Sequence, residues 1–192
     1  MRFLESLNMA MTVESLRVAI AHVRRSMESA HPMLSELDGQ LGDGDLGLTL
    51  VKAFRQLDEM APALEADLGS ALGRCAMAVS KVASSSFGTL LATSLMAAGK
   101  QVKGETDVPW SRLGSLLETT LSAMMARGKA ELGEKTLLDA VSACAMAVKG
   151  LDDPATQRAQ AVEAVDAALL EFRTRPCKVG RARIFGERTI GM

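Results

Sequence analysis

The sequence predicts an all-α fold in which about eight helices pack as a bundle with antiparallel neighbours. Apolar residues recur at helical spacing along the chain, whereas the alternation typical of a half-buried strand is missing. The hydrophobic fraction is 48%, but aromatic residues make up only 3% and tyrosine is absent, so the core must consist mainly of Ala, Leu, Val and Met. Such a composition favours helices. Glycines between the helical segments keep the connections short, and short connections join antiparallel neighbours.

The expected helices follow one another along the chain. The first opens at Thr12, a capping residue, and places Leu16, Ile20 and Val23 on one face. A second, short segment leads into a stretch rich in Asp and Gly, and a third helix runs over about 48–60, where a proline follows. Further helices are expected over 66–82, 89–98, 110–125, 136–148 and 154–172.

Length and charge indicate a single domain over 1–192. A chain of 192 residues without a linker or an internal repeat fits one domain. The net charge of −1 and the scarcity of aromatic side chains argue against a nucleic-acid surface. No apolar run approaches the roughly eighteen residues of a membrane helix, and the N-terminus lacks the pattern of a secretory leader. Since Cys75, Cys144 and Cys177 follow no metal-ligand spacing, we expect a cytoplasmic protein with idle thiols.

The stretch from Asp38 to Gly47 has the composition of a cation-binding loop. It places three carboxylates and four glycines in ten residues between two helical segments. Carboxylates this close repel each other by about 1 kcal/mol per pair in water and about 4 kcal/mol at an effective dielectric constant near 20, and a hard cation would remove that cost. Mg²⁺ bound together with phosphate fits better than Ca²⁺, because Phe54 stands where an EF-hand loop needs Glu. An ordinary Gly/Asp turn is the alternative that the spacing leaves open.

Three further stretches interrupt the apolar pattern with polar residues and glycine. Residues 84–88 (Ser-Ser-Ser-Phe-Gly) precede an apolar helix, whose free N–H groups suit a phosphate. Residues 127–139 join two helices through glycines and charged residues, and residues 180–191 gather three arginines. Taken singly, these stretches are typical of a helix cap, a solvated loop and a solvated basic tail.

Together and in this order, the four stretches resemble the nucleotide-binding L subunit of dihydroxyacetone kinases, and the resemblance covers most of the chain. The family's Gly-Asp-x-Asp-x-Gly loop reads Gly-Asp-Gly-Asp-Leu-Gly here, and its Gly/Thr/Ser-Gly turn reads Ser-Ser-Ser-Phe-Gly-Thr. After a shared Arg-Gly-Lys-Ala, its Gly-Asp-Lys-Thr-Met-Leu-Asp block reads Gly-Glu-Lys-Thr-Leu-Leu-Asp. Its tail, Gly-Arg-Ala-Ser-Tyr-Leu-Gly-Glu-Arg-Ser, reads Gly-Arg-Ala-Arg-Ile-Phe-Gly-Glu-Arg-Thr. One such match would be weak evidence, but four in order are specific.

The resemblance implies a closed barrel of up-and-down antiparallel helices that binds a nucleotide and two Mg²⁺ ions in the loops at one end. By position, it implies that the metal ligands are Asp38, Asp43 and Asp45. The phosphates of ADP or ATP would meet the start of the next helix, and Gly128 and Leu137 would line the adenine pocket. The implied nucleotide-contacting residues are Leu46, Gly47, Leu48, Thr49, Ser86, Phe87, Gly128, Leu137 and Arg181.

The implied activity is phosphoryl transfer to dihydroxyacetone or a related short hydroxy-ketone. In the family, a separate K subunit holds this acceptor through a histidine, which explains why the present chain offers no catalytic residue beyond its metal and phosphate site. In members that depend on the phosphotransferase system, a phosphohistidine M subunit recharges a bound ADP, whereas the nucleotide exchanges in ATP-dependent members. The sequence does not decide between these modes, and it leaves a homodimer open. No membrane or nucleic-acid partner is expected.

Two substitutions and one missing segment depart from the family pattern. Leu46 stands where the family often has His, Phe87 replaces a Ser that would donate to phosphate, and no Asp-Pro-Gly segment follows the tail. Because a lost hydrogen bond to a charged group costs roughly 1.5–3 kcal/mol, we expect weaker nucleotide affinity. Two other classes stay open, namely a non-catalytic regulator with the same fold and the nucleotide domain of a fatty-acid kinase.

Overall fold

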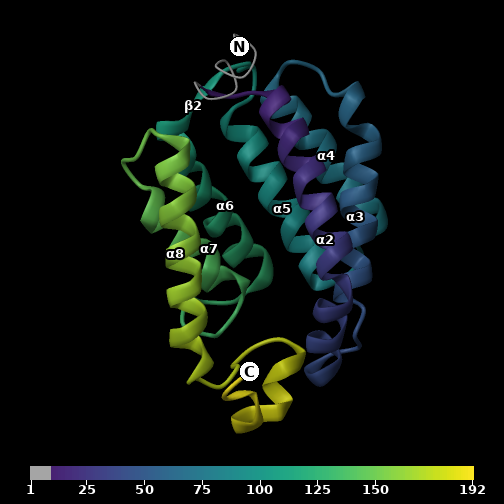
Figure 1. Cartoon of the computed structure of the whole chain (residues 1–192), viewed down its shortest axis with the longest axis vertical. Coiled ribbons are helices and arrows are strands. Elements are labelled where there is room, and N and C mark those ends of the chain that lie inside the picture. Colours follow the sequence, from purple (N-terminus) through teal and green to yellow (C-terminus); the bar gives the residue numbers. More distant parts are fainter. Residues whose placement is uncertain (1–9) are drawn as a thin grey trace. The chain divides into compact units, whose positions relative to one another are not determined.

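The structure, a computed structural model, describes residues 10–192, and these residues are mostly helical (Figure 1). The all-α fold class predicted from the sequence is therefore confirmed. None of the helices in this described part combines the length and apolarity that a membrane span requires. Two short strands, β1 and β2, pair with each other. The elements in chain order are β1 (Ala10–Met11), α2 (Val13–Leu41), α3 (Leu46–Met60), the 3₁₀ helix η1 (Ala61–Ala63), α4 (Leu68–Val82), α5 (Ser86–Gln101), β2 (Val108–Pro109), η2 (Trp110–Arg112), α6 (Leu113–Gly128), α7 (Leu137–Val148), α8 (Pro154–Arg173) and η3 (Arg181–Thr189).

The chain divides into two compact units, and each is described by itself. Unit 1 is Met1–Val108 and contains α2, α3, α4 and α5. Unit 2 is Pro109–Met192 and contains α6, α7, α8 and η3. The predicted closed barrel and the predicted single domain over 1–192 both depend on how the two units are arranged together, so they stay predictions.

Helix α2 is one helix of 29 residues, although the sequence predicted a first helix and a separate short segment. It begins at the predicted Thr12 cap, because Thr12 Oγ1 accepts from the Ser15 N–H and Ser15 Oγ accepts from the Thr12 N–H. Pro32 lies inside the helix. A proline removes one helical hydrogen bond and normally ends or kinks a helix. Because α3 packs against α2 both before and after Pro32, this packing outweighs the local cost of the proline.

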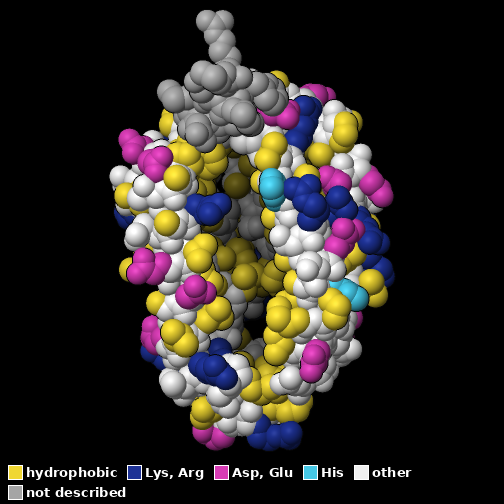
Figure 2. Space-filling view, viewed as in Figure 1, with side chains coloured by type: hydrophobic (Ala, Val, Ile, Leu, Met, Phe, Trp, Pro, Cys, Tyr) yellow, Lys and Arg dark blue, Asp and Glu magenta, His cyan; other side chains and the backbone are white. Residues whose placement is uncertain are grey.

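Ion pairs hold α3 against the part of α2 that precedes Pro32. Arg24 Nε lies 2.8 Å from Asp58 Oδ2, and Glu28 Oε1 accepts from Arg55 Nε at 2.7 Å. The hydrogen bond from Arg55 lowers the pKa of Glu28. Figure 2 shows Lys and Arg side chains gathered over α2 and α3. The first turn of α3 also lies against the backbone of α2 at His31 and, after Pro32, against the side chains of Ser35 and Asp38.

Helices α4 and α5 approach each other most closely where both carry glycine. A Cβ added at Gly69 would lie 2.5 Å from the carbonyl oxygen of Gly99 and 2.5 Å from the Cα of Lys103. A Cβ added at Gly99 would lie 2.8 Å from the carbonyl oxygen of Gly69. Gly73, one turn further along α4, faces open space. The two helices therefore leave no room for a side chain at Gly69, whereas a side chain at Gly73 would point into open space.

Replacing Gly69 by Ala should destabilise the fold, whereas replacing Gly73 by Ala should not. The Gly69→Ala methyl group clashes with backbone atoms that move only if α5 moves, and overpacking of this kind costs about 1–3 kcal/mol. In a chain of this size, each kcal/mol lowers Tm by about 2–4 °C. Gly73→Ala restricts the unfolded chain without a clash and should raise Tm slightly. Thermal unfolding followed by circular dichroism compares the variants, and equal Tm values would contradict the close approach.

In unit 2, α7 packs against both α6 and α8. Leu138 and Val148 of α7 are buried in this packing. Gln157 of α8 is only 2% exposed, and its Nε2 donates to the carbonyl oxygens of Trp110 and Leu151 at 2.8 Å each. These hydrogen bonds connect the first turn of α8 with the segments that precede α6 and α8.

Candidate functional site

The three aspartates predicted as metal ligands lie together in unit 1. One carboxylate oxygen from each of Asp38, Asp43 and Asp45 lies within 4.8 Å of the other two. Asp38 is half-buried near the end of α2, whereas Asp43 and Asp45 are exposed in the loop before α3. Opposite oxygen ligands of Mg²⁺ or Ca²⁺ are about 4–5 Å apart. The arrangement can therefore hold a divalent cation.

The backbone of the loop builds this cluster within a few residues. Gly44 has a φ of +73°, a left-handed conformation that glycine adopts without steric cost, and it turns the chain between Asp43 and Asp45. The N–H of Leu46 donates to Asp38 Oδ2 at 3.2 Å, which fixes Asp38 relative to the first residue of α3. Asp45 stands at the N-cap of α3, but its side chain makes no capping hydrogen bond. Its carboxylate joins the cluster instead.

Gly47 brings the first turn of α3 against the backbone of α2. It is buried, and a Cβ added here would lie 2.3 Å from the carbonyl oxygen of His31 and 2.7 Å from Ser35 Oγ. A residue with a side chain would therefore push the two helices apart. The first turn of α3 consists of the predicted phosphate-contacting residues Leu46, Gly47, Leu48 and Thr49, and it directly follows the aspartates.

Ser86 and Phe87 begin α5 at the same end of unit 1 as the aspartates. Helices α2 to α5 alternate in direction through short connections, so the loop between α2 and α3 and the turn between α4 and α5 lie at one end (Figure 1). Ser85 Oγ accepts from the Gly88 N–H at 3.2 Å and caps α5. Because of this cap, α5 begins at Ser86 and not near Thr89 as predicted.

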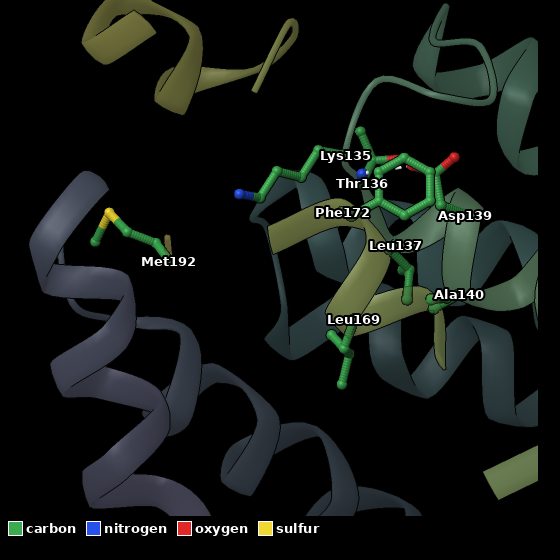
Figure 3. Close-up of a pocket in the computed structure, with 9 residues that line it drawn as sticks. Lys135, Thr136, Leu137, Asp139, Ala140, Leu169, Phe172 and Met192 are labelled. Atoms are coloured by element: carbon green, nitrogen blue, oxygen red, sulfur yellow. Dashed lines mark hydrogen bonds between the residues drawn. The ribbon is translucent and has the colours of Figure 1, made fainter. Parts of the chain in front are cut away.

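Unit 2 contains a pocket of about 300 Å³ between the start of α7 and the end of α8 (Figure 3). Leu137, predicted to contact the nucleotide, lies on its wall together with Phe172 of α8. A mostly apolar wall with a few polar groups is typical of a small-molecule site. The full lining is Lys135, Thr136, Leu137, Asp139, Ala140, Ala168, Leu169, Phe172 and Met192.

Asp139, for which the sequence predicted no role, organises the loop in front of this pocket. It is 8% exposed, and its two carboxylate oxygens accept from the N–H of Gly133 at 2.6 Å and from the N–H of Thr136 at 2.7 Å. Thr136 Oγ1 in turn accepts from the Leu138 N–H. The sequence carried a signal for this, because an acidic residue three positions after a Thr at a helix start has the pattern of a capping box.

Lys135 is a second residue whose role the sequence did not indicate. Its Nζ donates to the carbonyl oxygen of Thr189 at 2.7 Å and to that of Arg175 at 3.0 Å. Both acceptors are backbone atoms at least 40 residues away along the chain. No local pattern predicts such a contact, because any residue type supplies a backbone carbonyl.

The other predicted site residues of unit 2 lie elsewhere. Gly128 is the last residue of α6, Arg181 is the first residue of η3, and neither lines the pocket. The predicted nucleotide site is thus divided, with its metal and phosphate residues in unit 1 and Gly128, Leu137 and Arg181 in unit 2. The structure brings the three aspartates together with the first turn of α3. That the aspartates and the first turn of α3 form one nucleotide site with the pocket of unit 2 stays a prediction.

The cysteines are free thiols, as expected. Burial raises the pKa of the Cys75 thiol to about 11 and also raises the pKa of the Cys144 thiol. A thiol with a raised pKa is a poor nucleophile at neutral pH, so neither is a candidate for covalent chemistry.

Residues 40–192 match the model of the DAK2 domain family. The chain belongs to the DAK2 domain family. The match includes Asp43, Asp45 and the first turn of α3, and it begins two residues after Asp38. It also includes the start of α5, the pocket and η3. The family resemblance of the four stretches is therefore confirmed.

Relatives of this DAK2-domain chain include subunits of dihydroxyacetone kinases. The chain is 32% identical over 181 residues to the PEP-dependent dihydroxyacetone kinase 2, ADP-binding subunit DhaL, of Listeria innocua, covering 88% of this chain and 83% of that protein. It is 26% identical over 163 residues to the corresponding ADP-binding subunit DhaL of Escherichia coli, covering 82% and 78%. It is also 32% identical over 159 residues to triokinase/FMN cyclase of Homo sapiens, covering 78% of this chain and 27% of that longer protein.

Proposed function

We propose that this chain is the ADP-binding subunit of a dihydroxyacetone kinase and that it is active only with a partner subunit. The observation that carries the proposal is the cluster of Asp38, Asp43 and Asp45 beside the first turn of α3. The proposal is supported by the two bacterial relatives named above, which are ADP-binding subunits of such kinases and match over most of their length.

The metal and phosphate part of the site would lie in unit 1. Asp38, Asp43 and Asp45 would hold Mg²⁺, and by resemblance two ions, since carboxylate oxygens are the ligands that this cation prefers. When bound, Mg²⁺ supplies charge neutralisation on the phosphate oxygens. The first turn of α3 offers backbone N–H groups at the positive end of a helix, where phosphates bind readily. The phosphates would therefore meet the backbone of Leu46, Gly47, Leu48 and Thr49, with Ser86 and Phe87 at the neighbouring helix start.

The base part of the site would lie in unit 2. The pocket beside Leu137 is mostly apolar and is walled by Phe172 and Leu169, which suits a flat adenine ring. Gly128 would border the same base, and Arg181 would neutralise phosphate charge. For one nucleotide to use both parts, the two units would form a single domain over 1–192, which is the closed helical barrel of the family.

The reaction would be phosphoryl transfer to dihydroxyacetone, or a related short hydroxy-ketone, held on a separate K subunit. In such reactions the protein contributes mainly positioning and charge neutralisation, which the aspartates and the first turn of α3 can supply without a nucleophile. Since the bacterial relatives are named PEP-dependent, we favour a bound ADP that a phosphohistidine M subunit recharges in the cytoplasm. Because the Leu46 and Phe87 side chains carry no hydrogen-bond donor, nucleotide affinity would be lower than with His and Ser at these positions.

A reconstituted assay tests this proposal. The purified chain is mixed with a cognate K subunit, dihydroxyacetone and Mg²⁺, together with either ATP or phosphoenolpyruvate and the phosphotransferase proteins. We expect phosphorylated product only when the chain, the K subunit and Mg²⁺ are all present. Nucleotide that survives extensive dialysis would support recharging of bound ADP, whereas rapid exchange would support ATP turnover. Partner binding that needs no Mg²⁺ and gives no product would contradict the kinase and support a non-catalytic regulator.

A further inference from the structure

The segment that follows α8 is attached to the loop before α7 by the side chain of Lys135. The ammonium group donates to the carbonyl oxygens of Thr189 and Arg175, at 2.7 and 3.0 Å. Hydrogen bonds from a charged donor are stronger than neutral ones. Lys135 has a φ of +61°, a left-handed conformation that residues other than glycine seldom adopt. Two long-range hydrogen bonds and an uncommon backbone conformation at one residue indicate that its position is specified by the fold.

Further hydrogen bonds give the attached segment a defined structure. Thr189 is fully buried, and its Oγ1 accepts from the Cys177 N–H at 2.8 Å and donates to the Gly186 carbonyl oxygen at 2.7 Å. The N–H of Lys178 donates to the carbonyl oxygen of Glu134, the residue before Lys135, at 3.3 Å. The two ends of the segment 177–189 are therefore hydrogen-bonded to each other, and the segment is also bonded to the loop before α7.

The end of this segment returns to the pocket. The N–H of Gly191 donates to the carbonyl oxygen of Arg173 at 2.7 Å, and Arg173 Nε donates back to the carbonyl oxygen of Gly191 at 2.8 Å. Met192, the next residue, lines the pocket together with Leu137 and Phe172 (Figure 3). A contact that fixes this segment therefore also fixes part of the pocket wall.

We propose that Lys135 is a positioning residue. It holds the segment 177–189 on the loop before α7 and thereby keeps the pocket in the shape that binds the nucleotide. This inference rests on the proposed function, since it takes the pocket to be the adenine site. Lys135 is itself part of the pocket lining, but its ammonium group donates to two backbone carbonyls of the chain after α8, so its charged end is directed to that part of the chain. The two oxygens require a long side chain that ends in a charged group with several donors, and both lysine and arginine meet this requirement.

Three variants of the full chain separate this role from a general effect on folding. Lys135→Met keeps the length and apolar stem of the side chain but removes the donors, and Lys135→Arg restores charged donors. Lys129→Met is the matched control. Lys129 has the same left-handed conformation, with a φ of +51°, but it is exposed at the end of α6, and the described structure gives its side chain no hydrogen bond or ion pair.

Hydrogen exchange and ADP titration in Mg²⁺ are measured on all of these proteins. In Lys135→Met, the amides of Cys177, Lys178 and Gly191 should exchange about tenfold faster and the Kd for ADP should rise about tenfold, the combined effect of two modest hydrogen bonds. Lys135→Arg should lie within about threefold of the native chain in both measurements. Lys129→Met should match the native chain, and far-ultraviolet circular dichroism should show the same helix content throughout.

The outcomes distinguish failure of this inference from failure of the proposed function. Unchanged exchange in Lys135→Met would overturn the inference, and so would faster exchange with an unchanged Kd for ADP. A rise in Kd that Lys135→Arg fails to reverse would also overturn it. In these three cases ADP binding by the native chain would leave the proposed function standing. A native chain that binds no ADP in Mg²⁺ would instead contradict the proposed function, and the positioning role would fail with it.

Discussion

Replacing Asp45 by Asn should abolish Mg²⁺-dependent binding of ADP and lower phosphoryl transfer by about 10²–10³-fold. The fold-change is the order of magnitude seen when one preorganised electrostatic group is removed from an active site. Asn has nearly the same shape as Asp, so the change removes charge from the cluster without opening a cavity. Asp43→Asn should act in the same way, because its carboxylate oxygen lies within the same 4.8 Å group. Isothermal titration with ADP and the reconstituted assay measure the two effects.

The variants that lose ADP binding should nevertheless be more stable than the native chain when metal is removed. Without a cation, neighbouring carboxylates repel each other by about 1 kcal/mol per pair or more, so Asp45→Asn should raise Tm in EDTA. In Mg²⁺ with ADP, the native chain should gain stability from ligand binding and the variant should not. Glu36→Gln is the control, since Glu36 is exposed on α2 two residues before Asp38 and lies outside the cluster. A lower Tm of Asp45→Asn in EDTA would instead indicate that the loop is an ordinary turn.

Gly47→Ala should destabilise the fold and weaken the metal and phosphate region. The added Cβ would lie 2.3 Å from the carbonyl oxygen of His31, a backbone atom that moves only with α2. Overpacking of about 1–3 kcal/mol should lower Tm by several degrees, at about 2–4 °C per kcal/mol. Because the displaced turn carries Leu46 and its hydrogen bond to Asp38, affinity for ADP in Mg²⁺ should fall as well.

Thermal unfolding and ADP titration of Gly47→Ala test both effects. Gly73→Ala is the matched control, since it makes the same chemical change inside a helix where nothing lies within 4 Å of the new Cβ. A Gly47→Ala protein with the native Tm and the native Kd would show that α2 and α3 are not in backbone contact at this point.

Much of the fold could be predicted because helical periodicity and capping are local properties. Thr12 begins α2 as expected, and α4, α7 and α8 lie close to their predicted ranges. The prediction of a first helix and a separate short segment was wrong, because α2 continues through Pro32 as one helix that packs against α3. The start of α5 was placed three residues late, because Ser85 rather than a later residue supplies the cap. Tertiary contacts and the choice among several adjacent capping residues are not encoded in periodicity.

The site divides in the same way between local and long-range features. Asp38, Asp43 and Asp45 could be predicted to lie together because ten residues of loop contain them all. The spacing of Thr136 and Asp139 is also a local feature, since it fits a capping box at the start of α7. Lys135 could not have been found, since its acceptors are backbone carbonyls 40 and 54 residues away. The roles of Gly128 and Arg181 depend on how two separate units meet, and they stay predictions.

Titration of the native chain with ADP, in Mg²⁺ and in EDTA, tests the central claim most directly. Protein freed of any carried-over nucleotide is used, so that an empty site is measured under both conditions. We predict saturable binding of one ADP per chain in Mg²⁺, loss of that binding in EDTA, and loss in Mg²⁺ when Asp43 and Asp45 are both replaced by Asn. Absence of binding in Mg²⁺, or equal binding in EDTA, would contradict the claim that the aspartates beside α3 hold a metal for a nucleotide.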